Sequence, residues 1–250
     1  MQLRGWQVEP EALQNLILRA EQAPTLLRRL IEEQLVALVN LGDQRLAELE
    51  ASFREQQQLQ DDDTLSRWLD QRGWSHGDLQ LHLARPEALQ RFARHRFGPG
   101  LEEVFLQRKN GLDSAIYSLL RVRSAGLARE LWIQLSEGEI SFPEAAARHS
   151  DGPEASTKGI IGPVNLSQLQ PELAERLRSL QVGELRAPEP LGEWHVLLRL
   201  EQLTPARLDD AMRQRLLDDQ LNEWINQRCE RILAGEEPEP LDYDPHHESG

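Results

Sequence analysis

The chain has 250 residues, of which 39% are hydrophobic and 28% are charged, with a formal net charge of -14 and a mean hydropathy of -0.57. This length allows one or two domains, each with a core of its own. The sequence contains no apolar run of about 20 residues, so we expect no membrane insertion. The acidic excess argues against binding to nucleic acid, whose phosphates would be repelled. It suits a protein that stays soluble while exposing apolar surface to other chains, although solubility alone explains it equally well.

The first residues, Met1 to Trp6, lack the apolar stretch of a secretory signal peptide. Cys229 is the one cysteine, so the sequence supports no disulfide framework and no thiolate metal site. Both features predict a cytoplasmic protein. His246 and His247 lie on an acidic terminal stretch without a third fixed ligand, and we therefore expect no metal site and no cofactor.

The first 110 residues have the pattern of consecutive helices. Apolar residues recur at helical spacing over residues 25–39, Asn40–Gly42 interrupts that pattern, and Asp43 and Ser75 are suited to cap later helices. Pro86 is expected to end one of these helices. The expected helices cover residues 25–39, 43–58, 64–71, 75–86, 87–97 and 101–109. This part of the chain predicts an all-helical domain.

The pattern changes at Gly111. Residues 115–122, Ala-Ile-Tyr-Ser-Leu-Leu-Arg-Val, form a β-branched and aromatic run that predicts a strand. A last strand is expected over residues 194–201. Between them, helices are expected over residues 127–136, 142–148 and 171–179. A strand, two helices, a glycine-rich turn, a helix and a strand together predict an α+β unit.

Thr204 is predicted to begin a long amphipathic helix that runs to about Leu233. We expect its apolar side to pack on the N-terminal helices rather than on the sheet. From Gly235 onward the chain is rich in proline and acidic residues, which predicts disorder. The predicted division is a helical domain over 1–110, an α+β domain over 111–203, a C-terminal helix over 204–234 and a disordered acidic tail over 235–250.

The most informative stretch runs from His149 to Gly162 and contains a Ser-Asp turn followed by a spaced Gly-x-x-Gly. About thirty residues later, the sequence Gly-Glu-Trp-His at 192–195 opens an apolar strand. The Gly-x-x-Gly pattern is weak by itself, and the order and spacing of the pieces carry the signal. Together they resemble the parvulin family of peptidyl-prolyl isomerases over residues 113–202. The resemblance implies a parvulin-like small sheet with surrounding helices.

A second resemblance concerns the helices on both sides of this unit. Residues 30–35, Leu-Ile-Glu-Glu-Gln-Leu, are similar to the second-helix pattern of foldases of the SurA, PrsA and NifM type. In such foldases an all-α N-terminal segment and a returning C-terminal helix accompany the parvulin unit. The resemblance therefore implies an all-α, chaperone-like N-terminal domain.

Prolyl isomerisation forms and breaks no covalent bond. Its barrier is the resonance that the amide loses as its C–N bond twists. A catalyst needs a polar wall that stabilises the twisted state. The parvulin resemblance places this wall on His195 and on Ser118, where the family has its other histidine. The family's Cys or Asp falls near Gly152, with Asp151 one residue earlier. Since two members of the wall are replaced, we expect weakened catalysis.

The catalyst also needs an apolar socket for the proline ring. The resemblance places this socket on Leu169 and Leu173, with Leu120 and Ile161 beside them. The expected phenylalanine is a leucine here, which makes the socket shallower.

Each of these residues also has a purely structural interpretation. Gly159 and Gly162 are explained equally well by positive φ angles in a turn and by a close approach of the backbone to a client. The two leucines at helical spacing also suit a core, and His195 suits a hydrogen-bonded structural histidine. A hydrolase that uses Ser118, His195 and Asp151 is not favoured, because Ser118 lies in mid-strand rather than on a sharp turn.

The sequence therefore predicts a peptidyl-prolyl isomerase, or foldase, that acts on proline-containing, unfolded or precursor polypeptides. The alternative is a non-catalytic chaperone or binding module that holds a client for maturation or secretion. Both hypotheses predict that the protein suppresses aggregation of an unfolded protein. Only the first predicts turnover of a short X-Pro peptide.

Overall fold

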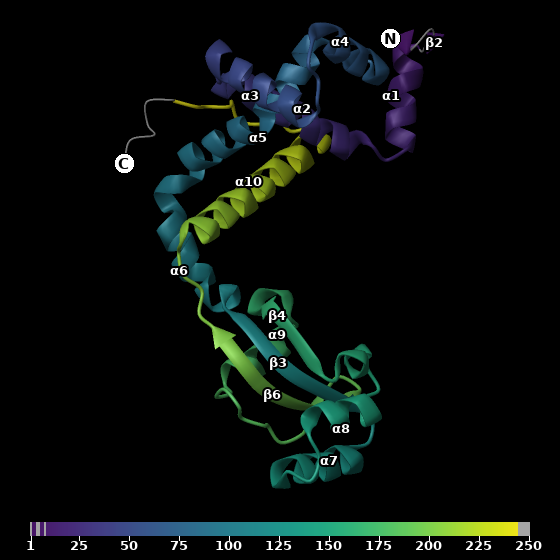
Figure 1. Cartoon of the computed structure of the whole chain (residues 1–250), viewed down its shortest axis with the longest axis vertical. Coiled ribbons are helices and arrows are strands. Elements are labelled where there is room, and N and C mark those ends of the chain that lie inside the picture. The colour runs from purple at the N-terminus through teal and green to yellow at the C-terminus, as the bar shows by residue number, and fades with distance from the viewer. Residues whose placement is uncertain (1, 4–5, 8, 245–250) are drawn as a thin grey trace. The chain divides into compact units, whose positions relative to one another are not determined.

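The computed structural model describes residues 2–3, 6–7 and 9–244, and the chain divides into two compact units (Figure 1). The helical unit comprises Met1–Glu102 and Asp209–Gly250, and the sheet unit comprises Glu103–Leu208. Among the described residues, no helix is long and apolar enough to cross a membrane. The α+β class predicted from the sequence is confirmed by these elements.

The helical unit is built from long helices that pack on one another. Its elements are β1 (Gln2–Leu3), β2 (Trp6–Gln7), α1 (Pro10–Arg19), α2 (Ala23–Val39), α3 (Asp43–Gln56), α4 (Asp62–Arg72), α5 (His76–Phe97) and α10 (Asp210–Leu233). Pro86 was expected to end a helix, but it lies inside α5. Its missing N–H removes one backbone hydrogen bond. Packing of α5 on α2, α3 and α10, with Ala84 and Ala88 fully buried, keeps the helix continuous.

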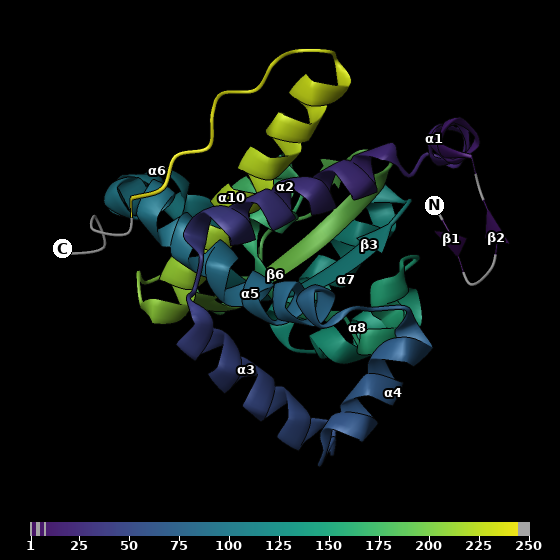
Figure 2. The same ribbon diagram turned by 90° about the horizontal axis from the view of Figure 1, so that it is seen from above.

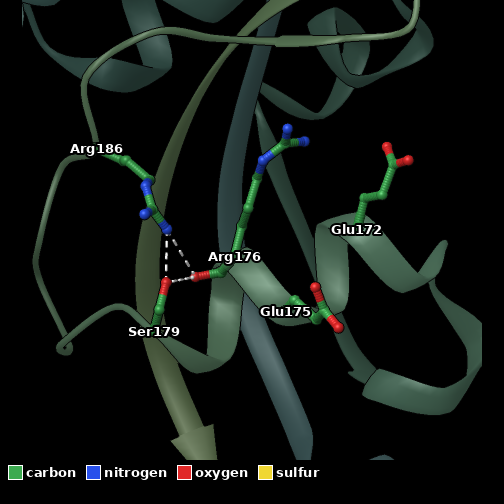
Figure 3. A pocket seen from close by; sticks show the side chains of 5 residues that line it. All are labelled: Glu172, Glu175, Arg176, Ser179 and Arg186. Atoms are coloured by element: carbon green, nitrogen blue, oxygen red, sulfur yellow. Dashed lines mark hydrogen bonds between the residues drawn. The ribbon is translucent and has the colours of Figure 1, made fainter.

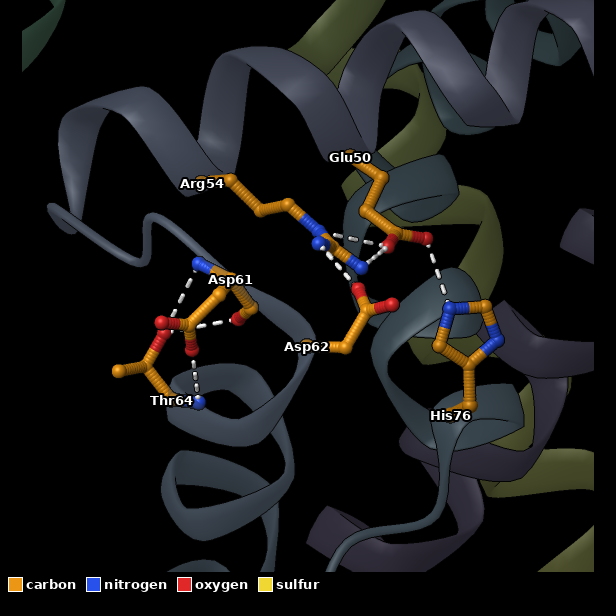
Figure 4. Close-up of polar contacts among 6 residues, drawn as sticks. All are labelled: Glu50, Arg54, Asp61, Asp62, Thr64 and His76. Carbon is orange, nitrogen blue, oxygen red and sulfur yellow. Dashed lines mark hydrogen bonds and ion pairs between the residues drawn. The ribbon is translucent and has the colours of Figure 1, made fainter.

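Polar contacts fix the turn between α3 and α4 (Figure 4). Arg54 of α3 pairs with Glu50 at 2.8 Å and with Asp62 of α4 at 2.7 Å. Asp61 caps α4, because its carboxylate accepts the backbone N–H of Thr64 at 2.7 Å. These contacts satisfy the free N–H groups of a helix start and hold α4 beside the end of α3.

Helix α10 packs on α2 and α5 and closes the core of the helical unit. Ile225 and Leu216 of α10 are fully buried, as are Leu35 of α2 and Phe92 of α5. The guanidinium of Arg28 in α2 donates to the side-chain carbonyl groups of Asn222 and Asn226. Burial and these hydrogen bonds together hold α10 on α2.

The start of α10 differs from the prediction. Thr204 does not cap a helix; it ends β6 and pairs with Ser114 in the sheet. The cap is Asp209, whose carboxylate accepts the backbone N–H of Met212 at 2.9 Å. A backbone that already pairs in a ladder has extended geometry, so the helix starts only after a short connection.

Beyond α10 the chain turns back, and its described residues up to Asp244 form no further helix or strand (yellow in Figure 2). Residues 235–244 of the predicted disordered tail make contacts within the helical unit. The ring of Tyr243 lies 5.0 Å from that of His95, and Glu239 to Asp242 border Phe92 of α5. Residues 245–250, with His246 and His247, lie outside the described part of the chain.

The sheet unit is a four-stranded antiparallel sheet in the order β4-β3-β6-β5 (Figure 1). Its strands are β3 (Ser114–Val122), β4 (Ile160–Asn165), β5 (Glu189–Leu191) and β6 (Trp194–Thr204). Its helices are α7 (Ala125–Glu137), α8 (Phe142–His149) and α9 (Pro171–Arg178), with short 3-10 turns η2 (Pro153–Thr157) and η3 (Leu166–Gln168). The 3-10 turn η1 (Gly98–Gly100) belongs to the helical unit, and α6 (Leu101–Leu112) crosses the boundary between the two units in the sequence. Periodicity predicted the two central strands and the helices α7, α8 and α9, and the edge strands β4 and β5 were missed.

Replacing Ile225 by alanine should lower the free energy of unfolding by about 2–5 kcal/mol, because it leaves a cavity between α10 and the helices beneath it. Leu233→Ala is the matched control in the same helix, since Leu233 is 51% exposed. We expect the control to change stability by less than about 0.5 kcal/mol in urea denaturation followed by circular dichroism. Equal losses in the two variants would contradict the packing described for α10.

Candidate peptide-binding face of the sheet

The pairing of β3 with β6 sorts the side chains of the sheet onto two faces. Opposed residues of an antiparallel ladder share a face, and successive residues alternate between faces. Tyr117 is paired with Leu200 and Leu119 with Leu198. These four side chains are buried in one cluster with Val196 and with Leu173, Ala174 and Leu177 of α9. We call this side of the sheet the α9 face.

The other side of the sheet packs on α7 and α8, and we call it the α7 face. Leu120 is paired with Leu197, and both are fully buried against it. Val122 is the next residue of β3 on this face, and it is paired with His195. The helices contribute Ala128, Leu131, Phe142, Ala145 and Ala146 to this cluster.

Ser118 lies on the α7 face, opposite Arg199. The residue is only 1% exposed, and its hydroxyl donates to the carboxylate of Glu201. Nε of Arg199 donates to the same carboxylate oxygen at 2.8 Å, and its guanidinium lies 5.3 Å from the centroid of the Phe142 ring. The Ser118 hydroxyl is therefore held in a buried polar network beneath α8 and does not face an open cleft.

His195 also lies on the α7 face, but four positions further along the strand, which corresponds to about 13 Å. It borders an open cleft of about 480 Å³ between α7 and the β5 edge. The other residues that line this cleft are Ala125, Arg129, Trp132, Ala187, Pro188 and Pro190. The structure therefore separates His195 from Ser118.

Asp151 and Gly152 follow α8. The backbone N–H of Asp151 donates to the carbonyl of Arg121 at 2.9 Å, and its carboxylate accepts the N–H of Arg123 at 3.3 Å. A Cβ atom added to Gly152 would lie 2.3 Å from the carboxylate of Glu154 and 2.4 Å from Nε of Arg121. The absence of a side chain at Gly152 thus leaves room for the ion pair between Arg121 and Glu154. The resemblance places a polar side chain at this position.

That ion pair joins Arg121 to Glu154. Nε and Nη2 of Arg121 each donate to one carboxylate oxygen at 2.8 Å, and the Glu154 side chain is 1% exposed. Burial alone would raise the pKa of Glu154, but hydrogen bonds from Arg121 and Ser150 outweigh it, so the pKa lies below its usual value. Arg121 is paired with Val196 and therefore lies on the α9 face. Sequence reasoning missed this pair, because nothing in the spacing of its members marks them.

Tyr117 is the other polar residue that sequence reasoning missed. It is buried on the α9 face, and burial raises the pKa of its hydroxyl, with a lowering influence from Arg121 and a raising one from Glu154. A hydroxyl with a raised pKa stays protonated at neutral pH and is a hydrogen-bond donor. Tyr117 and Arg121 are therefore the polar groups of β3 on this face.

The predicted socket residues divide between the two faces. Leu173 is buried in the α9-face cluster, and the partly buried Leu169 and Ile161 pack against it. Leu120 belongs to the α7 face and is fully buried there. Three of the four residues are thus brought together, and Leu120 is separated from them by the sheet.

The resemblance implied a polar wall of His195, Ser118 and the Asp151–Gly152 turn beside a socket of Leu169 and Leu173, and this combined arrangement is wrong. A strand sends alternate residues to opposite faces, and the register places Ser118 and His195 away from the two leucines. A role of either residue in catalysis stays a prediction.

The two glycines of the Gly-x-x-Gly pattern allow the chain to approach α8 at the start of β4 and β3 within it. Gly159 has a φ of +85°, and an added Cβ atom would lie 2.8 Å from Cβ of Ala146. Gly162 has a φ of +115°, and its added Cβ would lie 2.5 Å from the carbonyl oxygen of Ala115. Both positions require glycine for the fold itself, by conformation and by space.

A separate polar pocket lies beside α9 (Figure 3). It is lined by Glu172, Glu175, Arg176, Ser179 and Arg186. The Arg186 guanidinium donates to the Ser179 hydroxyl at 2.6 Å, and Arg176 and Arg186 both pair with Glu189 at 3.0 Å. These contacts hold the loop before β5 against α9. Among the described residues of the chain, no group of three His, Cys, Asp or Glu side chains is placed to hold a metal ion.

Residues 121–202 match the family model of the rotamase domain, described as the PPIC-type PPIase domain. The match covers most of the sheet unit and about a third of the chain. The chain therefore contains a parvulin-type, PPIC-type PPIase domain, with helices before and after it in the sequence.

Two curated relatives extend this similarity. The chain is 29% identical over 146 residues to Chaperone SurA of Nitrosococcus oceani, covering 52% of this chain and 33% of the relative. It is 36% identical over 103 residues to Chaperone SurA of Alkalilimnicola ehrlichii, covering 40% of this chain and 22% of the relative. The chain spans a third or less of the length of these two relatives.

A solved structure shares the fold over both units. Peptidylprolyl isomerase PrsA from Bacillus cereus matches with a TM-score of 0.51 and 13% sequence identity, covering 97% of this chain and 93% of that chain. At this identity the likeness concerns the fold alone.

Replacing Glu154 by glutamine should remove the charge of the buried ion pair while keeping the shape of the side chain. We expect a loss of about 3 kcal/mol at pH 7, at the lower end for a broken buried pair because Arg121 stays partly hydrated. The folded-state pKa of Glu154 lies below that of the unfolded chain. The ionised carboxylate therefore stabilises the fold above about pH 4.5, and this contribution disappears as the pH falls through the lower, folded-state pKa.

The measurement is urea denaturation between pH 3 and pH 7, with the exposed Glu172→Gln of α9 as the control. The acid-dependent part of the stability should shrink in the Glu154 variant and persist in the control. An unchanged pH profile in the Glu154 variant would contradict the role assigned to this pair.

Proposed function

We propose that this protein is a foldase that binds unfolded or precursor polypeptides and isomerises their X-Pro bonds slowly. The observation that carries the proposal is the match of residues 121–202 to the PPIC-type PPIase domain. The similarity to chaperones named SurA supports a role with polypeptide clients. The helices on both sides of the domain support a second surface for the same client.

The chemistry asked of this domain is differential binding rather than bond formation. A twisted X-Pro amide has lost its resonance, and a surface that binds the twisted form better than the planar form speeds isomerisation. On the α9 face, the partly buried Leu169 and Ile161 offer apolar contact for a proline ring, and the buried Leu173 belongs to the cluster on which they pack. The Tyr117 hydroxyl and the Arg121 guanidinium are the donors on that face for a rotating carbonyl.

We propose that this set of donors gives weak catalysis. The guanidinium of Arg121 is engaged by Glu154 through two hydrogen bonds, and Tyr117 is buried, so neither moves freely toward a substrate. Each missing contact of about 1.4 kcal/mol to the twisted amide lowers the rate tenfold. Two such losses place turnover about a hundredfold below that of a domain with a complete polar wall.

The second candidate function is a binding module without turnover. It is favoured by apolar side chains that the helical unit leaves in solvent: Leu16 and Leu18 of α1 and Leu26 and Leu30 of α2 are each more than 40% exposed. Exposed leucines of this kind suit contact with unfolded chains. Suppression of aggregation is expected of both candidates, and turnover of an X-Pro peptide is expected of the first.

Two further parts of the proposal are the cytoplasmic location and the preference for proline-containing clients. Cys229 is a buried free thiol, which agrees with a reducing compartment. The apolar contacts beside Tyr117 agree with a proline ring as the bound group.

Leu169→Ser should lower isomerisation of a short X-Pro peptide about tenfold or more, because it removes apolar contact from the α9 face. Val182→Ser is the matched control in the same unit, since Val182 is 63% exposed. His195→Ala should leave turnover within about twofold, because His195 lies on the other face. Turnover is measured by exchange NMR, and suppression of aggregation is recorded for each variant in parallel.

The opposite effects of these two substitutions would place the isomerase site on the α7 face. If His195→Ala abolished turnover and Leu169→Ser preserved it, the reaction would take place in the cleft between α7 and β5. If the unaltered protein suppressed aggregation and showed no turnover, the binding-module candidate would replace the isomerase.

A further inference from the structure

A groove in the helical unit combines aromatic rings with positive charge. Phe92 of α5 and Trp224 of α10 lie with ring centroids 5.3 Å apart. Arg96 of α5 and Arg228 of α10 line the same cavity, which measures about 360 Å³. We call this the α5–α10 groove. The part of its lining that comes from the helices carries two arginines, in a chain whose net charge is -14.

One wall of this groove is formed by a segment of the C-terminal tail, and the other residues that line it belong to α5 and α10. Glu239, Pro240, Leu241 and Asp242 line the cavity together with the aromatic and arginine residues. The segment has no regular secondary structure. It continues along α5, where the Asp244 backbone N–H donates to Nε2 of His95 at 3.3 Å.

The segment and the groove are chemically complementary. Proline and leucine meet aromatic rings, and two carboxylates border a cavity that also holds two guanidinium groups. Nε of Arg228 is buried and has no acceptor among the described residues. A buried donor without an acceptor destabilises the fold, so the groove retains a contact that a carbonyl or carboxylate of a peptide can supply.

The tail segment is less buried than the residues of the core. Glu239, Pro240 and Asp242 remain exposed, and Leu241 is only partly buried. A segment with few buried contacts opens locally at low cost. It is also tethered to the end of α10 by the short stretch 235–238, which gives it an effective concentration in the millimolar range.

We propose that the α5–α10 groove is a peptide-binding site and that residues 239–244 occupy it as a tethered competitor. The ligand class is an acidic peptide segment that carries proline and an aliphatic residue, as the tail does. This inference rests on the foldase proposal, because it assigns part of client binding to the helical unit. A client segment of this chemistry binds when it displaces the tail.

The probe is a fluorescein-labelled peptide with the sequence of residues 236–244, Glu-Glu-Pro-Glu-Pro-Leu-Asp-Tyr-Asp, and the readout is fluorescence anisotropy with the full-length protein. Leu241→Ser weakens the tethered segment, and the peptide should then bind about tenfold more tightly than it binds the unaltered chain. Glu237→Ser is the matched tail control, since Glu237 is exposed and does not line the groove; it should leave the affinity unchanged.

A third variant tests the groove itself. Adding the exposed Arg96→Glu to the Leu241→Ser chain should reverse the gain in affinity, and added salt should weaken binding to the Leu241→Ser chain. Equal affinity of the unaltered and Leu241→Ser chains, or binding that is insensitive to Arg96→Glu, would overturn the proposal.

The foldase proposal fails independently of this one. Peptide binding without suppression of aggregation or X-Pro turnover would contradict the foldase proposal and support the groove as a peptide-binding site. Suppression of aggregation without peptide binding would contradict the groove proposal and support the foldase proposal.

Discussion

The pairing of β3 with β6 decides which side chains of the sheet unit can meet a client. The ladder runs along the whole of Ser114–Val122, and its register shifts between Ile116 and Tyr117. The shift leaves Glu201 of β6 without a partner in β3, so the alternation of β3 itself is not interrupted. Ala115, Tyr117 and Leu119 are therefore buried together on the α9 face, and Ser118 lies on the α7 face.

Each face then has a different physical character. Both faces are covered by helices, the α7 face by α7 and α8 and the α9 face by α9, and on the α7 face Glu201 engages the hydroxyl of Ser118. The α9 face ends in the Arg121–Glu154 ion pair, for which Gly152 leaves the space. An apolar row with a neutralised guanidinium at its end suits the binding of an uncharged peptide group better than proton transfer. This character supports the proposal that the domain holds a proline-containing segment more than it isomerises it quickly.

Much of this fold follows from the sequence, and the missing parts have physical causes. Apolar periodicity predicted β3, β6 and the helices that cover them, because burial on one side enforces a period of two or of 3.6 residues. Pro86 misled the prediction, since packing on three helices compensates for its missing hydrogen bond. The predicted site failed at a finer level. Spacing located Ser118 and His195 on the right strands, but which face of the sheet packs on α9 and which residue pairs with Arg121 are set by tertiary contacts.

The central claim is that a proline-containing peptide binds on the α9 face of the sheet. Methyl NMR of the full-length chain, labelled at isoleucine and leucine and titrated with a short X-Pro peptide, tests it directly. The account predicts shifts concentrated on Ile161, Leu169 and Leu173, which border that face. Shifts confined to Leu120 and Leu197, which lie beneath α7 and α8, with none at the first three residues, would contradict it.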